Sequence, residues 1–336
     1  MRLLVLSAGA VRSVLGYATC AEAMRGVLAA RARGEVFQPL RSVLKPDGAT
    51  GLMGLMPCYQ ASAGYGLKAL CIVPANPAAG LDSHQGIVLL SSRETGQPLA
   101  ILNASAVTEI RTAAVSAVAT DLLARPDADV LAIVGTGVQA RSHLMAIAAT
   151  RALAEIRIAG STPARAAKFA ADIAPAALAE VGASPVPVIA CESARAAADG
   201  AAIVVTVTSS ATPVLDAGWL SPGTHINAVG ACLPHIRELD TQTVANAALF
   251  ADSRESLLAE SGDYLLAAAD GAIGPGHIRA EIGDLLAGLA PGQGRRHETE
   301  ITIFESLGLA VEDLAAASVA YQAARDASAG AWVDFD

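Results

Sequence analysis

The stretch DVLAIVGTGVQARSHLMAIAA, residues 129–149, decides the fold. Its apolar run ends in Gly135-x-Gly137-x-x-Ala140, and a helical pattern follows at once. Glycine permits a tight turn and a close approach of the backbone to a ligand, while the first N–H groups of a helix can bind phosphate. Ala140 lets the helix pack closely on the strand. The stretch therefore predicts a strand, turn and helix that bind the pyrophosphate of a dinucleotide.

A tight strand-to-helix turn without a ligand has the same local pattern, so the flanking sequence matters. After the turn, short apolar runs alternate with helical segments, which predicts βαβ units and a parallel sheet buried on both faces. The runs are EIRIAG (155–160), VPVIA (186–190), AIVVTVT (202–208), HINAVG (225–230) and ALFAD (248–252), and helices are predicted over 139–152, 163–180 and 193–198.

The chain on either side of this region has a different pattern. An alanine-rich helix is predicted from 104 to 124, where Arg125-Pro126 ends it. The segment before it predicts an α+β unit. Its elements are a strand within 1–14, a helix over 21–33, strands near 40–44, 51–56, 66–73 and 86–91, and a hairpin turn at 91–97. At the other end, EITIFES (300–306) precedes a helix predicted over 309–327, which we expect to pack back on the first domain.

Composition narrows the class of protein. With 336 residues, of which 53% are hydrophobic, the chain can form two domains. The net charge of -9 and the lack of a Lys/Arg stripe argue against nucleic acid as a partner. Five scattered cysteines without a C-x-x-C pair predict no disulfide framework, no metal site and a reducing compartment. Since Arg12 interrupts the apolar start and no run is long enough to span a bilayer, we expect a cytoplasmic protein without a membrane partner.

The adenosine end of the site shows no acidic residue. After the strand EIRIAG, where a carboxylate would bind the ribose of NAD, the chain has Ser161 and Thr162, with Arg165 one turn later. These residues can accept a 2′-phosphate, so the sequence favours NADP over NAD. A simple helix cap at Ser161 or Thr162 is the alternative.

Several segments together resemble the ornithine cyclodeaminase and mu-crystallin family, and its ketimine reductase branch most closely. They are VFQPLRSVL (36–44), GLMGLMP (51–57), YGLKAL (65–70), SHQGIVLL (83–90), IRTAAVSAVAT (110–120), IVGTGVQARSH (133–143), HINAVGA (225–231), ADSRESLLAESGD (251–263) and IFESLGLAVEDLA (303–315). The resemblance implies an α/β fold in which a Rossmann-type, doubly wound parallel sheet (119–303) is inserted into an α+β substrate and dimerisation domain (1–118 and 304–336), and it implies a homodimer.

The resemblance also implies two sets of binding residues. Arg41, Lys68 and Arg111 would bind the carboxylate of a small imino or amino acid, since Arg can bind it with two parallel hydrogen bonds and Lys adds a point charge. Lys68 would also donate a proton, with its pKa lowered by the two arginines. The coenzyme contacts would be His84, Gln85, Arg111, Thr112, Gly135, Gly137, Val138, Gln139, Ser161, Thr162, Thr206, Thr208, Val229, Ser306 and Leu307. His84 as a turn cap, and Thr206 and Thr208 as ordinary strand residues, remain open alternatives.

Two departures from the family pattern concern the chemistry. Ornithine cyclodeaminases have acidic residues at the positions of Gly54 and Cys232. Deamination needs a proton carrier, for which a carboxylate is suited. We interpret Cys232 as a small buried residue rather than an acid, and His235 is another proton donor to consider.

The sequence therefore predicts an NAD(P)H-dependent oxidoreductase that reduces a cyclic ketimine acid, Δ1-pyrroline-2-carboxylate or Δ1-piperideine-2-carboxylate, to L-proline or L-pipecolate. The alternatives are an open-chain amino acid dehydrogenase of the alanine type, an ornithine cyclodeaminase, and a crystallin-like protein that binds NADP without turnover.

Overall fold

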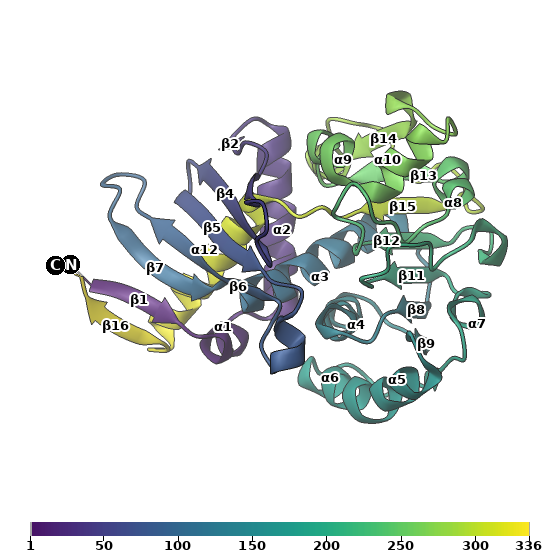
Figure 1. Cartoon of the computed structure of the whole chain (residues 1–336), viewed down its shortest axis with the longest axis horizontal. Coiled ribbons are helices and arrows are strands. Elements are labelled where there is room, and N and C mark those ends of the chain that lie inside the picture. Colours follow the sequence, from purple (N-terminus) through teal and green to yellow (C-terminus); the bar gives the residue numbers. More distant parts are fainter. Residues whose placement is uncertain (1, 336) are drawn as a thin grey trace. The chain divides into compact units, whose positions relative to one another are not determined.

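The computed structural model describes residues 2–335, and the chain divides into two compact units (Figure 1). Unit 1 comprises Met1–Arg111 and Gly308–Asp336, and unit 2 comprises Thr112–Leu307. The predicted domain boundaries lie at 118/119 and 303/304. Helix α3 (Ala104–Leu123) runs through the first junction, so no turn in the chain marks a boundary there.

Unit 1 is built on a mixed sheet of eight strands among the described residues, in the order β16-β1-β7-β6-β5-β4-β2, with β3 paired to β4. Strand β1 runs parallel to β7, and β4 to β7 form antiparallel pairs. The strands are β1 (Arg2–Leu6), β2 (Val36–Phe37), β3 (Ser42–Leu44), β4 (Leu52–Gln60), β5 (Gly64–Ile72), β6 (His84–Ser91), β7 (Pro98–Asn103) and β16 (Ala331–Asp334). The helices are α1 (Ala8–Val14), α2 (Tyr17–Ala32), the short 3-10 helix η1 (Asn76–Ala79) and α12 (Ala310–Asp326).

Helix α12 covers one face of this sheet, packing on β4, β5, β6 and helix α2. The strand register places Met56, Lys68 and Val88 side by side across β4, β5 and β6, and all three are buried. Side chains alternate along a strand, so the neighbours of Lys68 on β5 point to the other face. The sheet therefore delivers one lysine into an otherwise apolar layer beneath α12.

Unit 2 is a parallel sheet with helices, and its strand order β10-β9-β8-β11-β12-β15-β13-β14 reverses direction between β8 and β11. This is the arrangement of a doubly wound sheet with its topological switch point beside the first strand. The strands are β8 (Val130–Val134), β9 (Glu155–Ala159), β10 (Val188–Ala190), β11 (Ile203–Thr206), β12 (His225–Ala228), β13 (Ala248–Ala251), β14 (Ile278–Glu281) and β15 (Thr302–Glu305). The helices are α4 (Val138–Thr150), α5 (Pro163–Lys168), the π-helix η2 (Phe169–Ile173), α6 (Ala174–Glu180), α7 (Ala194–Ala198), the 3-10 helix η3 (Ala217–Trp219), α8 (Thr241–Asn246), α9 (Arg254–Glu260), α10 (Gly262–Ala269), the 3-10 helix η4 (Pro275–His277) and α11 (Ile282–Leu286).

The predicted α/β class with a doubly wound parallel sheet is confirmed, as are the hairpin between β6 and β7 and the packing of the C-terminal helix on unit 1. Three local expectations need correction. The apolar start forms β1 and then helix α1 rather than strand alone. Strand β4 continues past Pro57 to Gln60 because it pairs with β5 over its whole length. The helix predicted over 163–180 contains the π-helix η2 just before Pro175, whose ring cannot follow a regular α-helical hydrogen-bond pattern.

The turn after β8 gives a matched pair of glycines. Gly135 has φ +135°, and an added Cβ would lie 2.6 Å from the carbonyl oxygen of Val207. Gly137 has φ -89°, and an added Cβ there would meet no atom within 4 Å. We expect Gly135→Ala to lower the free energy of unfolding by about 1–3 kcal/mol, whereas Gly137→Ala leaves it almost unchanged. Urea unfolding of both variants measures this difference, and equal stability would contradict it.

Candidate active site

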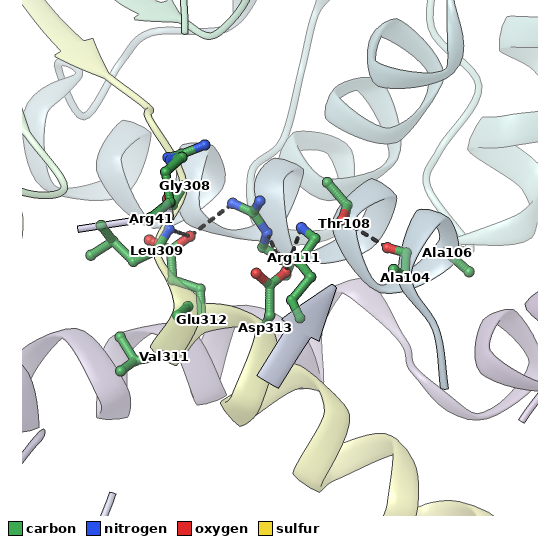
Figure 2. A network of polar contacts seen from close by, with 12 residues as sticks. Arg41, Ala104, Ala106, Thr108, Arg111, Gly308, Leu309, Val311, Glu312 and Asp313 are labelled. Carbon is green, nitrogen blue, oxygen red and sulfur yellow. Dashed lines mark hydrogen bonds and ion pairs between the residues drawn. The ribbon is translucent and has the colours of Figure 1, made fainter. Parts of the chain in front are cut away.

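A group of positive side chains forms the centre of the candidate site in unit 1. Lys68 comes from β5, Arg111 from α3 and Arg41 from the segment between β2 and β3, and all three reach the chain segment that begins helix α12. Arg41 Nη2 donates to the carbonyl oxygen of Gly308 at 2.9 Å. A Cβ on Gly308, which has φ +81°, would lie 2.5 Å from Arg111 Nη1. The structure thus brings together the three residues predicted as a carboxylate-binding set. Figure 2 shows two of them, Arg41 and Arg111, beside the start of α12.

Two carboxylates in the first turn of α12 are part of the same group. Arg111 Nε and Lys68 Nζ donate to a single oxygen of Asp313, at 3.0 and 3.1 Å. Arg111 Nη1 donates to Glu312 at 2.9 Å (Figure 2). Both acids are fully buried, and a buried charge is tolerated only beside an opposite one. Lys68 and Arg111 are therefore paired with acidic residues of the protein itself.

The sequence analysis missed Glu312 and Asp313, although both stand in the segment IFESLGLAVEDLA. Acidic residues are common in the first turn of a helix, where they favour the positive end of the helix dipole. Glu312 also fulfils that ordinary role, since it accepts the N–H of Leu309 at 3.1 Å. Nothing local distinguishes such a cap from a partner of Arg111.

The charges of this group are closely coupled. Glu312 and Asp313 form ion pairs with Lys68 and Arg111, and Arg41 adds a further positive side chain beside Gly308. Burial lowers the pKa of Lys68 to about 8; the charge of Asp313 raises it and that of Arg111 lowers it further. The lowered pKa expected from the neighbouring arginines is present, but burial is its largest cause.

Two other predicted residues of unit 1, His84 and Gln85, begin strand β6 and are exposed. Both are tied to the preceding loop, because Asp82 accepts the backbone N–H of His84 at 3.1 Å and the side-chain amide of Gln85 at 3.1 Å. The capping group of this turn is thus the side chain of Asp82 and not the His84 ring. Its imidazole ring contacts the hydroxyl of Ser83 at 3.0 Å.

Nearly all predicted coenzyme residues of unit 2 lie at one edge of the parallel sheet, where neighbouring strands end. Backbone hydrogen bonds connect neighbouring strand ends along this edge. The N–H of Gly135 donates to the carbonyl of Ala159, that of Val207 to the carbonyl of Val134, and that of Ser306 to the carbonyl of Ala228. Gly135 and Gly137 follow β8, Ser161 and Thr162 follow β9, Thr206 ends β11 and Thr208 follows it, Val229 follows β12, and Ser306 and Leu307 follow β15. Ligands of doubly wound sheets bind at this edge.

The start of helix α4 fits a phosphate group. No side chain caps its N-terminus at Gly137, so its first N–H groups have no side-chain acceptor. Val138 is exposed at this end of the helix. Gln139 is the next helical residue, and Thr112, at the start of unit 2, is buried on α3. An uncapped helix start beside a glycine with open space around it is suited to a pyrophosphate.

At the adenosine end of this edge, one of the two predicted hydroxyls caps a helix and the other contacts an arginine. Thr162 caps helix α5, with its hydroxyl accepting the N–H of Arg165 at 3.3 Å. Ser161 instead accepts the guanidinium of Arg165 at 3.3 Å. A hydroxyl and a guanidinium therefore lie side by side on an exposed turn, where both can reach a ligand.

The two departures from the family pattern lie in different surroundings. Gly54 is on the face of β4 that also carries Met56, opposite Lys68 on β5, so an acid at position 54 would lie on the face of Lys68. Cys232 is exposed, so the expectation of a buried residue is wrong; it lies in the loop after β12 rather than in the packed sheet. His235, in the same loop, is also exposed.

Two kinds of feature are absent from residues 2–335. No group of three or more His, Cys, Asp or Glu side chains in this range has the arrangement of a metal site. No helix in it is long and apolar enough to cross a membrane.

Comparison with known proteins agrees with this fold. A model of the ornithine cyclodeaminase/mu-crystallin family matches residues 1–328. The ketimine reductase mu-crystallin of Mus musculus is 39% identical over 289 residues, covering 86% of this chain and 85% of the mouse protein. The structure of Thermococcus litoralis Δ1-pyrroline-2-carboxylate reductase in complex with NADH and L-proline has a TM-score of 0.91 and 34% identity, covering 98% of this chain and 99% of that chain. An archaeal alanine dehydrogenase dimer with bound NAD has a TM-score of 0.90 and 32% identity, covering 100% of both chains. The chain belongs to the ornithine cyclodeaminase/mu-crystallin family.

Proposed function

We propose that this protein reduces the C=N bond of a cyclic ketimine acid, Δ1-pyrroline-2-carboxylate or Δ1-piperideine-2-carboxylate, to L-proline or L-pipecolate. Its relatives include a ketimine reductase and a pyrroline-2-carboxylate reductase bound to NADH and L-proline, and it is an NAD(P)-dependent oxidoreductase acting on C=N bonds. The observation that supports a substrate with a carboxylate is the group formed by Arg41, Lys68 and Arg111 around the start of α12.

Three positive side chains close together are suited to binding a substrate carboxylate. Arg41, which donates to a main-chain carbonyl, and Arg111 would hold the carboxylate, since guanidinium groups bind it with defined geometry. A bound nicotinamide coenzyme supplies the hydride that reduces the imine carbon. Lys68 would give a proton to the imine nitrogen, which completes the amine. A pKa near 8 keeps most of Lys68 protonated at neutral pH and still lets it release the proton.

The lack of carboxylates at two positions also favours reduction of a preformed imine over deamination. Gly54, on the face of Lys68, and Cys232, after β12, offer no carboxylate to carry protons during deamination. Once Lys68 had given its proton to the nitrogen, the imine would be electrophilic, so alignment and electrostatics could supply much of the remaining activation. The likeness to an archaeal alanine dehydrogenase makes an open-chain imino acid the competing substrate.

We propose NADP(H) as the preferred coenzyme. The pyrophosphate would bind at the uncapped start of α4, and the 2′-phosphate would bind between Ser161 and Arg165, which are 3.3 Å apart. No acidic side chain follows β9 at this turn to repel the phosphate.

A substrate and coenzyme panel tests the proposed reaction. Pyrroline-2-carboxylate, piperideine-2-carboxylate, and pyruvate with ammonia would each be assayed with NADPH and with NADH. We expect turnover of a cyclic imine, a lower KM for NADPH, and loss of that preference in Arg165→Ala with NADH kinetics unchanged. If pyruvate with ammonia is the only substrate that is turned over, the reaction is of the alanine type. If none of the substrates is turned over, only a binding function remains.

The pH dependence tests the role of Lys68. Because the donor must be protonated, kcat/KM for reduction should be constant below about pH 8 and fall above it. Asp313→Asn removes the negative charge that raises the pKa of Lys68, so the falling limb should move to lower pH. Lys68→Met should lower kcat/KM by about 100-fold or more.

The exposed Glu94→Gln variant serves as the control for the change of charge, and its profile should coincide with that of the wild type. If the limb stays in place in Asp313→Asn, or if Lys68→Met keeps wild-type kcat/KM, Lys68 is not the proton donor.

We also propose that the chain forms a homodimer through the face of the mixed sheet that α12 leaves uncovered. Tyr65, Ile87 and Met53 are exposed there, and Leu67 and Leu89 face each other across β5 and β6 on the same side. A sheet that is apolar on both faces favours a partner on the second one. One related structure is a dimer.

Sedimentation measures this association. The wild type should sediment at twice the chain mass of 33.9 kDa. Ile87→Glu should shift it to the monomer, because a charge would be buried in an apolar interface. Leu289→Glu, an exposed position in unit 2, should leave the dimer intact. A dimer that survives Ile87→Glu would place the interface elsewhere.

The five cysteines form no disulfide, and we propose a reducing, cytoplasmic location for this reason. Cell fractionation tests it.

A further inference from the structure

A buried glutamate joins two of the loops that end the parallel sheet of unit 2. One carboxylate oxygen of Glu238 accepts the N–H of Thr208 at 2.5 Å, and the other accepts the N–H of Gly230 at 2.7 Å. Thr208 follows β11 and Gly230 follows β12. The Glu238 side chain is fully buried, so it acts on these two backbone segments and not on solvent.

The glutamate is itself held in place. A single oxygen of Asp263, which is fully buried, accepts the N–H groups of Glu238 and Leu239 at 2.9 and 2.8 Å. The contact with Gly230 is also close, since a Cβ there would lie 2.6 Å from the carboxylate of Glu238 and 2.3 Å from the carbonyl oxygen of Thr208. The two loops and the glutamate therefore have little freedom to shift independently.

A carboxylate suits this position for a specific reason. Two N–H groups from different loops need two acceptors, and an ionised carboxylate offers an acceptor on each oxygen. An amide of the same shape offers only one, and its NH₂ group would face the second N–H. Burial raises the pKa of Glu238 above its usual value, and the N–H donors of Thr208 and Gly230 offset part of that rise.

The location of these loops indicates what they position. A doubly wound sheet binds one mononucleotide with each of its halves, and the glycine turn and the adenosine ribose belong to the half built on β8 and β9. Strands β11 and β12 lie on the other side of the switch point. The loops joined by Glu238 therefore belong to the half that receives the second mononucleotide.

We propose that Glu238 is a positioning residue for the nicotinamide half of the coenzyme, holding the Thr208 and Gly230 loops at the spacing that this half requires. The proposal rests on the proposed coenzyme function. It assigns no contact between Glu238 and the coenzyme, because the glutamate would act through the two backbone segments.

Calorimetric titration of Glu238→Gln with whole and truncated coenzymes tests the proposal. NADPH contains the whole nicotinamide mononucleotide half, whereas 2′-phospho-AMP lacks it; NADH and AMP form the equivalent pair. We expect the Kd of NADPH or NADH to rise roughly tenfold or more, since an accepted hydrogen bond is replaced by an unfavourable contact between two N–H donors. The Kd of the truncated ligand should not change.

The control is Glu300→Gln. Glu300 is a partly buried carboxylate of the same unit, pairs with Arg279 at 2.7 Å and accepts the N–H of Arg296 at 2.8 Å. It precedes β15 and so lies at the opposite edge of the sheet. This variant can lose stability, but both ligands should bind as in the wild type.

The outcomes separate this proposal from the coenzyme function itself. If the wild type binds neither ligand of either pair, the coenzyme function is wrong. If the wild type binds both and Glu238→Gln weakens both equally or neither, Glu238 does not position the nicotinamide half. If Glu238→Gln fails to fold, Gly230→Ala replaces it, because its added Cβ would crowd the same carboxylate, and this variant must show the selective loss. If neither variant folds, the proposal is overturned in favour of a purely structural role.

Discussion

The carboxylate of Asp313 accepts hydrogen bonds from Lys68 and Arg111 on a single oxygen, and both cations are almost completely buried. Neither could remain charged in the apolar layer under α12 without this acid and Glu312. The first turn of α12 must therefore lie where β5 and α3 bring their cations. The same arrangement affects the pKa of Lys68, which burial lowers and the charge of Asp313 raises, so the packing of the helix and the proposed chemistry of the site have one physical origin.

Unit 2 concentrates its polar groups in a different way. Its parallel strands are buried on both faces, as β8, β11, β12, β13 and β15 show. Backbone N–H groups become available where the strands end, and there the chain places glycines, hydroxyls and a helix start without a cap. The buried acids of this unit, such as Glu238 and Asp263, accept backbone N–H groups at that edge. These acids fix the backbone at the edge of the sheet, whereas Glu312 and Asp313 neutralise the charges of buried cations.

A feature of this protein could be predicted from the sequence where its residues are adjacent in the chain. The Gly135 turn was found because its strand, glycines and helix are adjacent in the chain. Arg41, Lys68 and Arg111 were found through a family resemblance, since no local pattern relates them. Glu312 and Asp313 were missed because an acidic first turn has an ordinary explanation, and their partner lies about 200 residues away. Cys232 was expected to be buried because cysteine commonly is, but its surroundings depend on a loop whose course the sequence does not reveal.

The route of the chain has a consequence for how the protein is made. Lys68 and Asp313 are 245 residues apart, and all of unit 2 is encoded between Arg111 and Gly308. A ribosome therefore releases β5 and the start of α3 long before it makes the acids that neutralise them. Unit 2 is continuous in sequence and can fold as soon as it emerges, whereas unit 1 cannot be completed until the final helix has been synthesised. During translation its two buried cations remain without their partners, which favours hydration or chaperone contact over premature collapse of this layer.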